Sequence, residues 1–99
     1  MISLVLKTKS TKASIDDFKF FDNVKVRRSS NPKSWPKHKL YNQLESTKEL
    51  DSIHNQLGSI AFLLIKNDSI IQEKYFLGYN ESSMTNSFSM SKSIISFLL

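Results

Sequence analysis

A short, wholly apolar run at residues 60–65 is the feature that most limits how this chain can fold. A run of this length is typical of a β-strand that is covered on both faces. Asn67 and Asp68 follow it as a turn signal, and residues 69–77 then return with mixed polarity, apolar side chains standing among polar ones. The sequence therefore predicts an antiparallel β-hairpin. We expect residues 59–66 to be buried on both faces and residues 69–77 to lie nearer an edge.

An amphipathic helix is predicted just before this hairpin, over residues 43–57. Its apolar positions recur at helical spacing, at Leu44, Leu50, Ile53 and Leu57. Residues 46–49, Ser-Thr-Lys-Glu, fit a capping box, and Gly58 is placed to end the helix. His54 lies on or beside the apolar stripe, and His38 lies in a loop. Neither has metal ligands or catalytic partners in the sequence, so we predict structural roles for both.

The pattern Ser-x-x-K, which can supply a nucleophile and its base, occurs at Ser30/Lys33, Ser34/Lys37 and Ser89/Lys92. Pro32 and Pro36 interrupt the first two and disfavour the helical turn that would bring serine and lysine together. Ser89 and Lys92 instead stand at the start of a predicted helix, where residues three apart share a face. A serine attacks a carbonyl only with a base beside it, and a neutral lysine can be that base. The alternative is a helix-capping serine next to a solvated lysine.

Residues 58–70, 73–79 and 86–93 together resemble the start of a β-lactamase-related serine hydrolase. That superfamily includes class C β-lactamases, penicillin-binding proteins, esterases and 6-aminohexanoate-dimer hydrolases, and the resemblance covers roughly residues 44–99. Ser89 matches the acylated nucleophile of the family and Lys92 its general base. The family also carries a Tyr-x-Asn or Ser-x-Asn element and a His/Lys-x-Gly element on a later strand. Neither follows Ser89 within the 99 residues.

The resemblance implies an α+β fold, the N-terminal part of a β-lactamase-like domain with an amphipathic helix, an antiparallel hairpin and a nucleophile helix. It implies acyl transfer to Ser89 and hydrolysis of a small amide, ester or lactam, with no cofactor and no metal. We expect the chain to be truncated within the nucleophile helix and to be inactive by itself. The family resemblance suggests that the protein is located in the cell envelope or periplasm. The apolar run in residues 1–7 is too short for a signal peptide.

The net charge of +5 is concentrated in residues 1–40, which hold ten Lys or Arg against three Asp. We therefore divide the chain into a basic, loop-rich leader at 1–42 and the hydrolase-like portion at 43–99. We expect no nucleic-acid partner and at most a weak contact between the leader and an anionic surface. A noncatalytic remnant or partner-binding module with the same fold elements remains open as an alternative. A third reading, a peptide that binds nucleic acid or membrane, depends on the leader alone.

Overall fold

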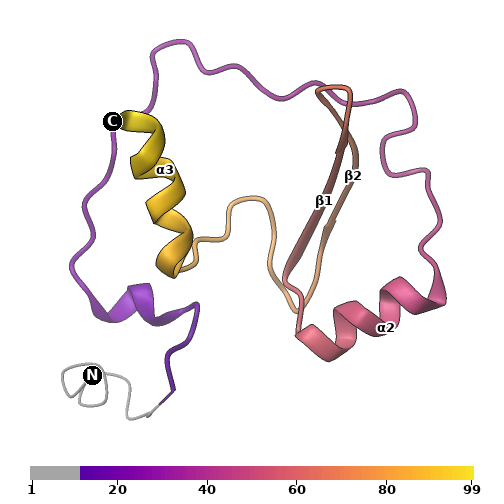
Figure 1. Ribbon diagram of the computed structural model, residues 1–99, viewed down its shortest axis with the longest axis horizontal. Coiled ribbons are helices and arrows are strands. Elements are labelled where there is room, and N and C mark those ends of the chain that lie inside the picture. Colours follow the sequence, from indigo (N-terminus) through magenta and orange to yellow (C-terminus); the bar gives the residue numbers. More distant parts are fainter. Residues whose placement is uncertain (1–11) are drawn as a thin grey trace. The chain divides into compact units, whose positions relative to one another are not determined.

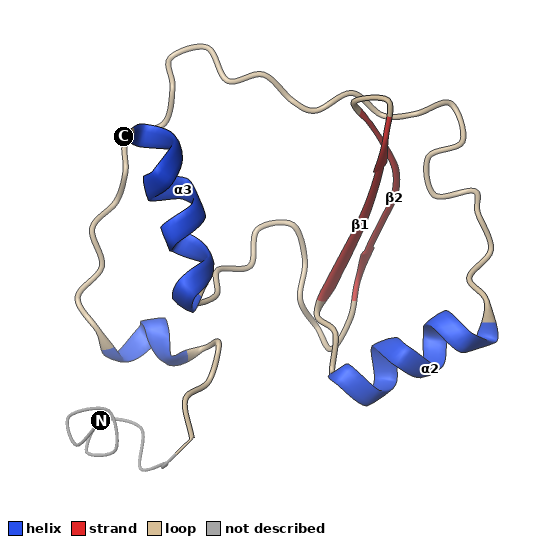
Figure 2. Cartoon of the chain, viewed as in Figure 1, coloured by secondary structure: helices blue, strands red, loops and turns tan. Residues whose placement is uncertain are grey.

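The computed structural model describes residues 12–99, so the N-terminal part of the basic leader lies outside the described residues. The described residues form two compact units, one of residues 28–83 and the other of residues 12–27 together with 84–99. The described part contains two α-helices and one antiparallel sheet of two strands (Figures 1 and 2). The expected α+β class is confirmed at this level.

Helix α2 (Lys48–Leu57) is the first helix or strand in the unit of residues 28–83. Thr47 is its N-cap, and the Thr47 hydroxyl accepts a hydrogen bond of 3.2 Å from the Leu50 N–H. The helix thus begins five residues later than predicted. The cap is also one position later than in the predicted capping box, because the Ser46 hydroxyl donates to the carboxylate of Asp51 instead. Gly58 ends the helix in the left-handed conformation, with φ of 60°, as its position in the sequence predicted.

Strands β1 (Ala61–Lys66) and β2 (Ser69–Tyr75) form the predicted hairpin, lying antiparallel with Lys66 opposite Ser69 (Figure 1). Asn67 and Asp68 connect them with φ of 47° and 57°. Positive φ at both central residues is the signature of a type I′ turn, whose twist matches that of the flanking strands. The register is irregular between Leu64 and Ile65, where β2 carries one extra residue.

The predicted burial of the two strands is wrong. Side chains of β1 are largely exposed, including Leu63, Leu64 and Ile65 at 46%, 41% and 43%. The buried strand is β2, where Ile70 and Ile71 form the apolar core of the described residues.

The cause is a segment of the leader, residues 36–42, that lies against the far edge of β2. Ile70 donates from its N–H to Pro36 O and accepts at its carbonyl from the His38 N–H, both at 2.9 Å. The Asn42 N–H bonds to Ile71 O at 2.8 Å. Among residues 12–99, strand β2 is therefore flanked on both edges, and β1 on one only.

The other unit contains the 3₁₀ helix η1 (Asp17–Phe20), the 3₁₀ helix η2 (Phe88–Met90) and helix α3 (Ser91–Leu98). Its two stretches of chain are joined by a hydrogen bond of 2.7 Å from the Asn86 N–H to Ile15 O. Helix α3 exposes its large apolar side chains, at Ile94, Ile95, Phe97 and Leu98. Among the described residues, no helix has the length and apolar character needed to cross a membrane.

Candidate functional site

Ser89 and Lys92 lie on consecutive turns of one helical segment. Ser89 is the middle residue of η2, and Lys92 is in the first turn of α3. Both side chains are exposed, and within residues 12–99 no hydrogen bond joins them. The helix predicted at Ser89 is present, although its first turn is 3₁₀ and the α-helix starts only at Ser91. The pairing of Ser89 with Lys92 as nucleophile and base stays a prediction.

The backbone around Ser89 has two features that matter for acyl transfer. Phe88, directly before it, has φ of 48°, a left-handed conformation that is unusual for a bulky side chain. The Phe88 carbonyl accepts a hydrogen bond of 2.8 Å from the Ser91 hydroxyl. The Ser89 N–H has no acceptor in the part of the chain that the structure describes. A free N–H at the start of a helix is a donor that can stabilise negative charge.

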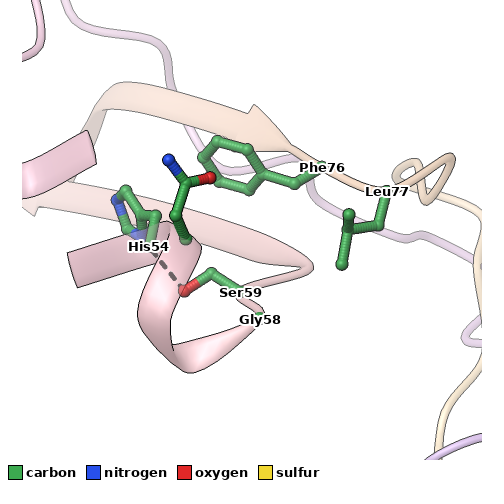
Figure 3. A pocket seen from close by; sticks show the side chains of 6 residues that line it. His54, Gly58, Ser59, Phe76 and Leu77 are labelled. Atoms are coloured by element: carbon green, nitrogen blue, oxygen red, sulfur yellow. Dashed lines mark hydrogen bonds between the residues drawn. The ribbon is translucent and has the colours of Figure 1, made fainter. Parts of the chain in front are cut away.

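A cavity with polar groups lies in the unit of residues 28–83, where α2 ends. It has a volume of about 270 Å³ and is lined by His54, Asn55, Gly58, Ser59, Phe76 and Leu77 (Figure 3). His54 Nδ1 and Ser59 Oγ are 3.0 Å apart and share a hydrogen bond. Ser59 was not predicted as a site residue. The available signal was a histidine and a serine on either side of a helix-ending glycine, which reverses the chain and brings them together.

The surroundings of His54 are those of a packed side chain. Its ring centroid lies 4.8 Å from that of Phe62 and 4.9 Å from that of Phe76. Only 9% of the residue is exposed, and Nε2 is buried with no hydrogen-bond partner among the described residues. A serine with a histidine can form a nucleophile and base, but such a base is normally oriented by a third group at its other nitrogen. No such group is present at Nε2, so this pair does not complete a catalytic arrangement.

His38 is engaged by the backbone, since its Nδ1 accepts a hydrogen bond of 3.1 Å from the Leu40 N–H. No group of three or more His, Asp or Glu side chains in residues 12–99 is placed to hold a metal ion.

Comparison of this chain with models of protein families, with curated proteins and with solved structures gave no match.

Proposed function

We propose that this chain is the N-terminal portion of a β-lactamase-related serine hydrolase, with Ser89 as the acylated nucleophile and Lys92 as its general base. The observation that carries the proposal is the conformation at Ser89. The N–H of Ser89, unpaired among the described residues, and the Ser89 hydroxyl belong to η2, directly before α3, and Lys92 follows in the first turn of α3. The left-handed Phe88 adds support, because strained backbone in bulky residues clusters at functional sites. The order of helix, hairpin and Ser-x-x-Lys helix agrees with the family resemblance.

In the proposed reaction, neutral Lys92 takes the proton from Ser89 Oγ while the oxygen attacks the carbonyl carbon of an amide, ester or lactam. The resulting oxyanion accepts a hydrogen bond from the Ser89 N–H. The tetrahedral intermediate then collapses: the C–N or C–O bond of the substrate breaks, the leaving nitrogen or oxygen takes the proton back from Lys92, and an acyl-enzyme remains, to which the freed amine of a lactam stays attached. Water hydrolyses the acyl-enzyme and regenerates the Ser89 hydroxyl.

Lys92 can act as a base only if it loses its proton near neutral pH. Burial or a nearby cation lowers the pKa of a lysine, and Lys92 is exposed in the described part of the chain. We therefore expect the 99-residue chain to be unreactive by itself. Any longer chain that covers Lys92 and places a second cation beside it should be reactive.

The test is intact-mass analysis after exposure to a fluorophosphonate, applied to the 99 residues and to a longer chain that includes them. We expect no adduct on the 99 residues and one adduct on the longer chain. That adduct should disappear in Ser89→Ala and persist in the matched control Ser87→Ala. An adduct that survives Ser89→Ala, or a longer chain that takes up no probe, would contradict the assignment of the nucleophile.

The exposed apolar side chains of α3 favour a second candidate, a noncatalytic module that binds a partner through this helix. Phe97 is 92% exposed and Leu98 is 82% exposed. Full burial of a side chain of this size lowers the free energy by about 1.5–3 kcal/mol. Binding of a partner that covers these side chains would therefore be favourable. Ser89→Ala separates the two candidates: a hydrolase loses its function in this variant, whereas a binding module keeps it and loses it in Phe97→Asp.

A further inference from the structure

Ser91 bonds back to Phe88, the residue directly before the proposed nucleophile. The Ser91 hydroxyl donates a hydrogen bond of 2.8 Å to the Phe88 carbonyl oxygen. The backbone N–H of Ser91 donates to the same oxygen. Two donors of one residue therefore hold the Phe88 carbonyl, and the reaction proposed above gives Ser91 no part.

The Phe88 carbonyl and the Ser89 N–H belong to the same peptide group. That group is trans. A trans peptide is planar, and its C=O and N–H point in opposite directions. The Ser89 N–H itself has no acceptor within residues 12–99. The contacts that Ser91 makes with the carbonyl therefore set the direction in which the Ser89 N–H points.

The conformation of Phe88 gives these contacts a specific task. With φ of 48°, Phe88 occupies the left-handed region, which bulky L-residues avoid because Cβ crowds the backbone. Such a conformation persists only where surrounding contacts hold it. A serine hydroxyl that bonds to an earlier carbonyl is common within helices. Here, however, the acceptor is the carbonyl of the strained residue.

We propose that Ser91 is a positioning residue of this hydrolase: its hydroxyl holds the Phe88 carbonyl and thereby aims the Ser89 N–H at the oxyanion. This inference rests on the proposed function. A donor stabilises developing negative charge well only if it is oriented before the reaction begins. Ser91 supplies that orientation through a rigid peptide and does not contact the substrate.

The orientation of this peptide can be measured without any reaction. Phe88-Ser89 is the one Phe-Ser pair in the sequence. In the 99-residue chain, labelled with ¹³C at phenylalanine carbonyls and ¹⁵N at serines, an NMR spectrum that correlates each amide with the preceding carbonyl therefore gives a single peak. Ser91→Ala should shift this peak, because the carbonyl loses a hydrogen bond.

Two further variants serve as controls. Ser91→Thr should restore the peak, since a threonine hydroxyl can bond to the carbonyl three residues earlier. Ser93→Ala is the matched control, because Ser93 lies in the same helix and its hydroxyl has no hydrogen bond in the described part of the chain. It should leave the peak in place.

The second readout is the rate constant for fluorophosphonate labelling of Ser89 in the longer chain. Ser91→Ala should lower this rate constant by about 10–100-fold, less than complete removal of an oxyanion donor does. The factor should be the same at every pH, because a peptide N–H does not titrate. Ser91→Thr should recover the rate, and Ser93→Ala should keep it.

Four results would overturn the positioning role while leaving Ser89 as the nucleophile. They are an unmoved peak in Ser91→Ala, an undiminished labelling rate in that variant, a loss that Ser91→Thr does not reverse, and a shift of the pH profile, which would place the effect at Lys92. Failure of the proposed function gives a different result, because the longer chain with Ser91 intact then takes up no probe. In that case Ser91 orients a peptide that no reaction uses, and the positioning role is refuted together with the function.

Discussion

The phenol of Tyr41 donates a hydrogen bond of 2.9 Å to Oε2 of Glu73, joining residues that are 32 positions apart in the chain. The other carboxylate oxygen of Glu73 accepts a hydrogen bond from the Tyr75 hydroxyl. Lys37 Nζ lies 4.2 Å from the centroid of the Tyr41 ring. Together with the backbone bonds to Ile70, these contacts hold the segment 36–42 on β2.

Removal of the Tyr41 hydroxyl should weaken this attachment. We expect Tyr41→Phe to lower the free energy of unfolding by about 1 kcal/mol, the net value of a single hydrogen bond. A double-mutant cycle with Glu73→Ala, measured by urea unfolding, should give a favourable coupling between the two residues. The same cycle with Glu49→Ala in place of Glu73→Ala should give none. Equal coupling in both cycles would mean that the hydrogen bond does not contribute.

Stability should depend on pH through the same cluster. The hydrogen bonds from Tyr75 and then Tyr41 lower the pKa of Glu73 below its ordinary value of 4.5. A lowered pKa stabilises the fold above pH 4.5, and this contribution is lost as the pH falls through the pKa of the folded state. The hydrogen bond to Glu73 raises the pKa of Tyr75 from 10.0 to about 12. That contribution is complete below pH 10 and is lost as the pH rises to about 12.

The midpoint of urea unfolding should therefore fall at both extremes of pH. In Glu73→Gln the acidic fall should be smaller, because residue 73 no longer changes charge. The alkaline fall should also shrink, because Tyr75 no longer faces a carboxylate. An unchanged profile in this variant would show that other groups set the pH dependence.

The end of α2 offers a test of backbone conformation alone. Gly58 has φ of 60°, and a Cβ atom placed there would have no heavy atom within 4 Å. We expect Gly58→Ala to cost about 1–2 kcal/mol, because L-residues are strained in this region. D-Alanine at the same position, introduced by chemical synthesis, adds the same methyl group and favours positive φ. It should leave the stability unchanged or raise it, and a loss with both enantiomers would point to steric crowding.

The contact between His54 and Ser59 should be more sensitive to removal of one partner than of both. Ser59→Ala leaves both ring nitrogens of a buried histidine without a partner, which should cost about 1–3 kcal/mol. His54→Phe combined with Ser59→Ala removes the polar groups together and keeps an aromatic ring between Phe62 and Phe76. The double variant should unfold at a higher urea concentration than Ser59→Ala alone. If Ser59→Ala unfolded at the higher urea concentration, water would be satisfying the histidine nitrogens in solution.

Much of the local structure could be predicted from the sequence because it depends on neighbouring residues. Gly58 ends a helix and Asn67-Asp68 turns a hairpin for reasons of backbone conformation that operate over a few positions. The burial of the strands could not be predicted in this way. It depends on residues 36–42, which contain Pro36 and a run of polar side chains and so were interpreted as loop. Nothing in the pattern of β1 or β2 specifies which edge that segment covers.

The same difference between local and long-range determinants applies to the candidate sites. Ser89 and Lys92 were found from their spacing, which is a local property. The left-handed Phe88 was not foreseen, because the residue types that mark positive φ are glycine and asparagine rather than phenylalanine. The cavity beside His54 was also missed, because Phe76 reaches it only after the hairpin has returned along the chain.

The turn at Asn67 and Asp68 also has a consequence for the order of folding. It joins two strands that pair with each other and follow one another directly in the sequence. A hairpin of this kind forms in about 1–10 μs. The contact of Tyr41 with Glu73 must instead close a loop several times longer, at a larger entropic cost. We therefore expect the hairpin to form first and the segment 36–42 to dock afterwards on a surface that already exists. Substitutions at the turn should slow folding, whereas substitutions at Tyr41 should mainly speed unfolding.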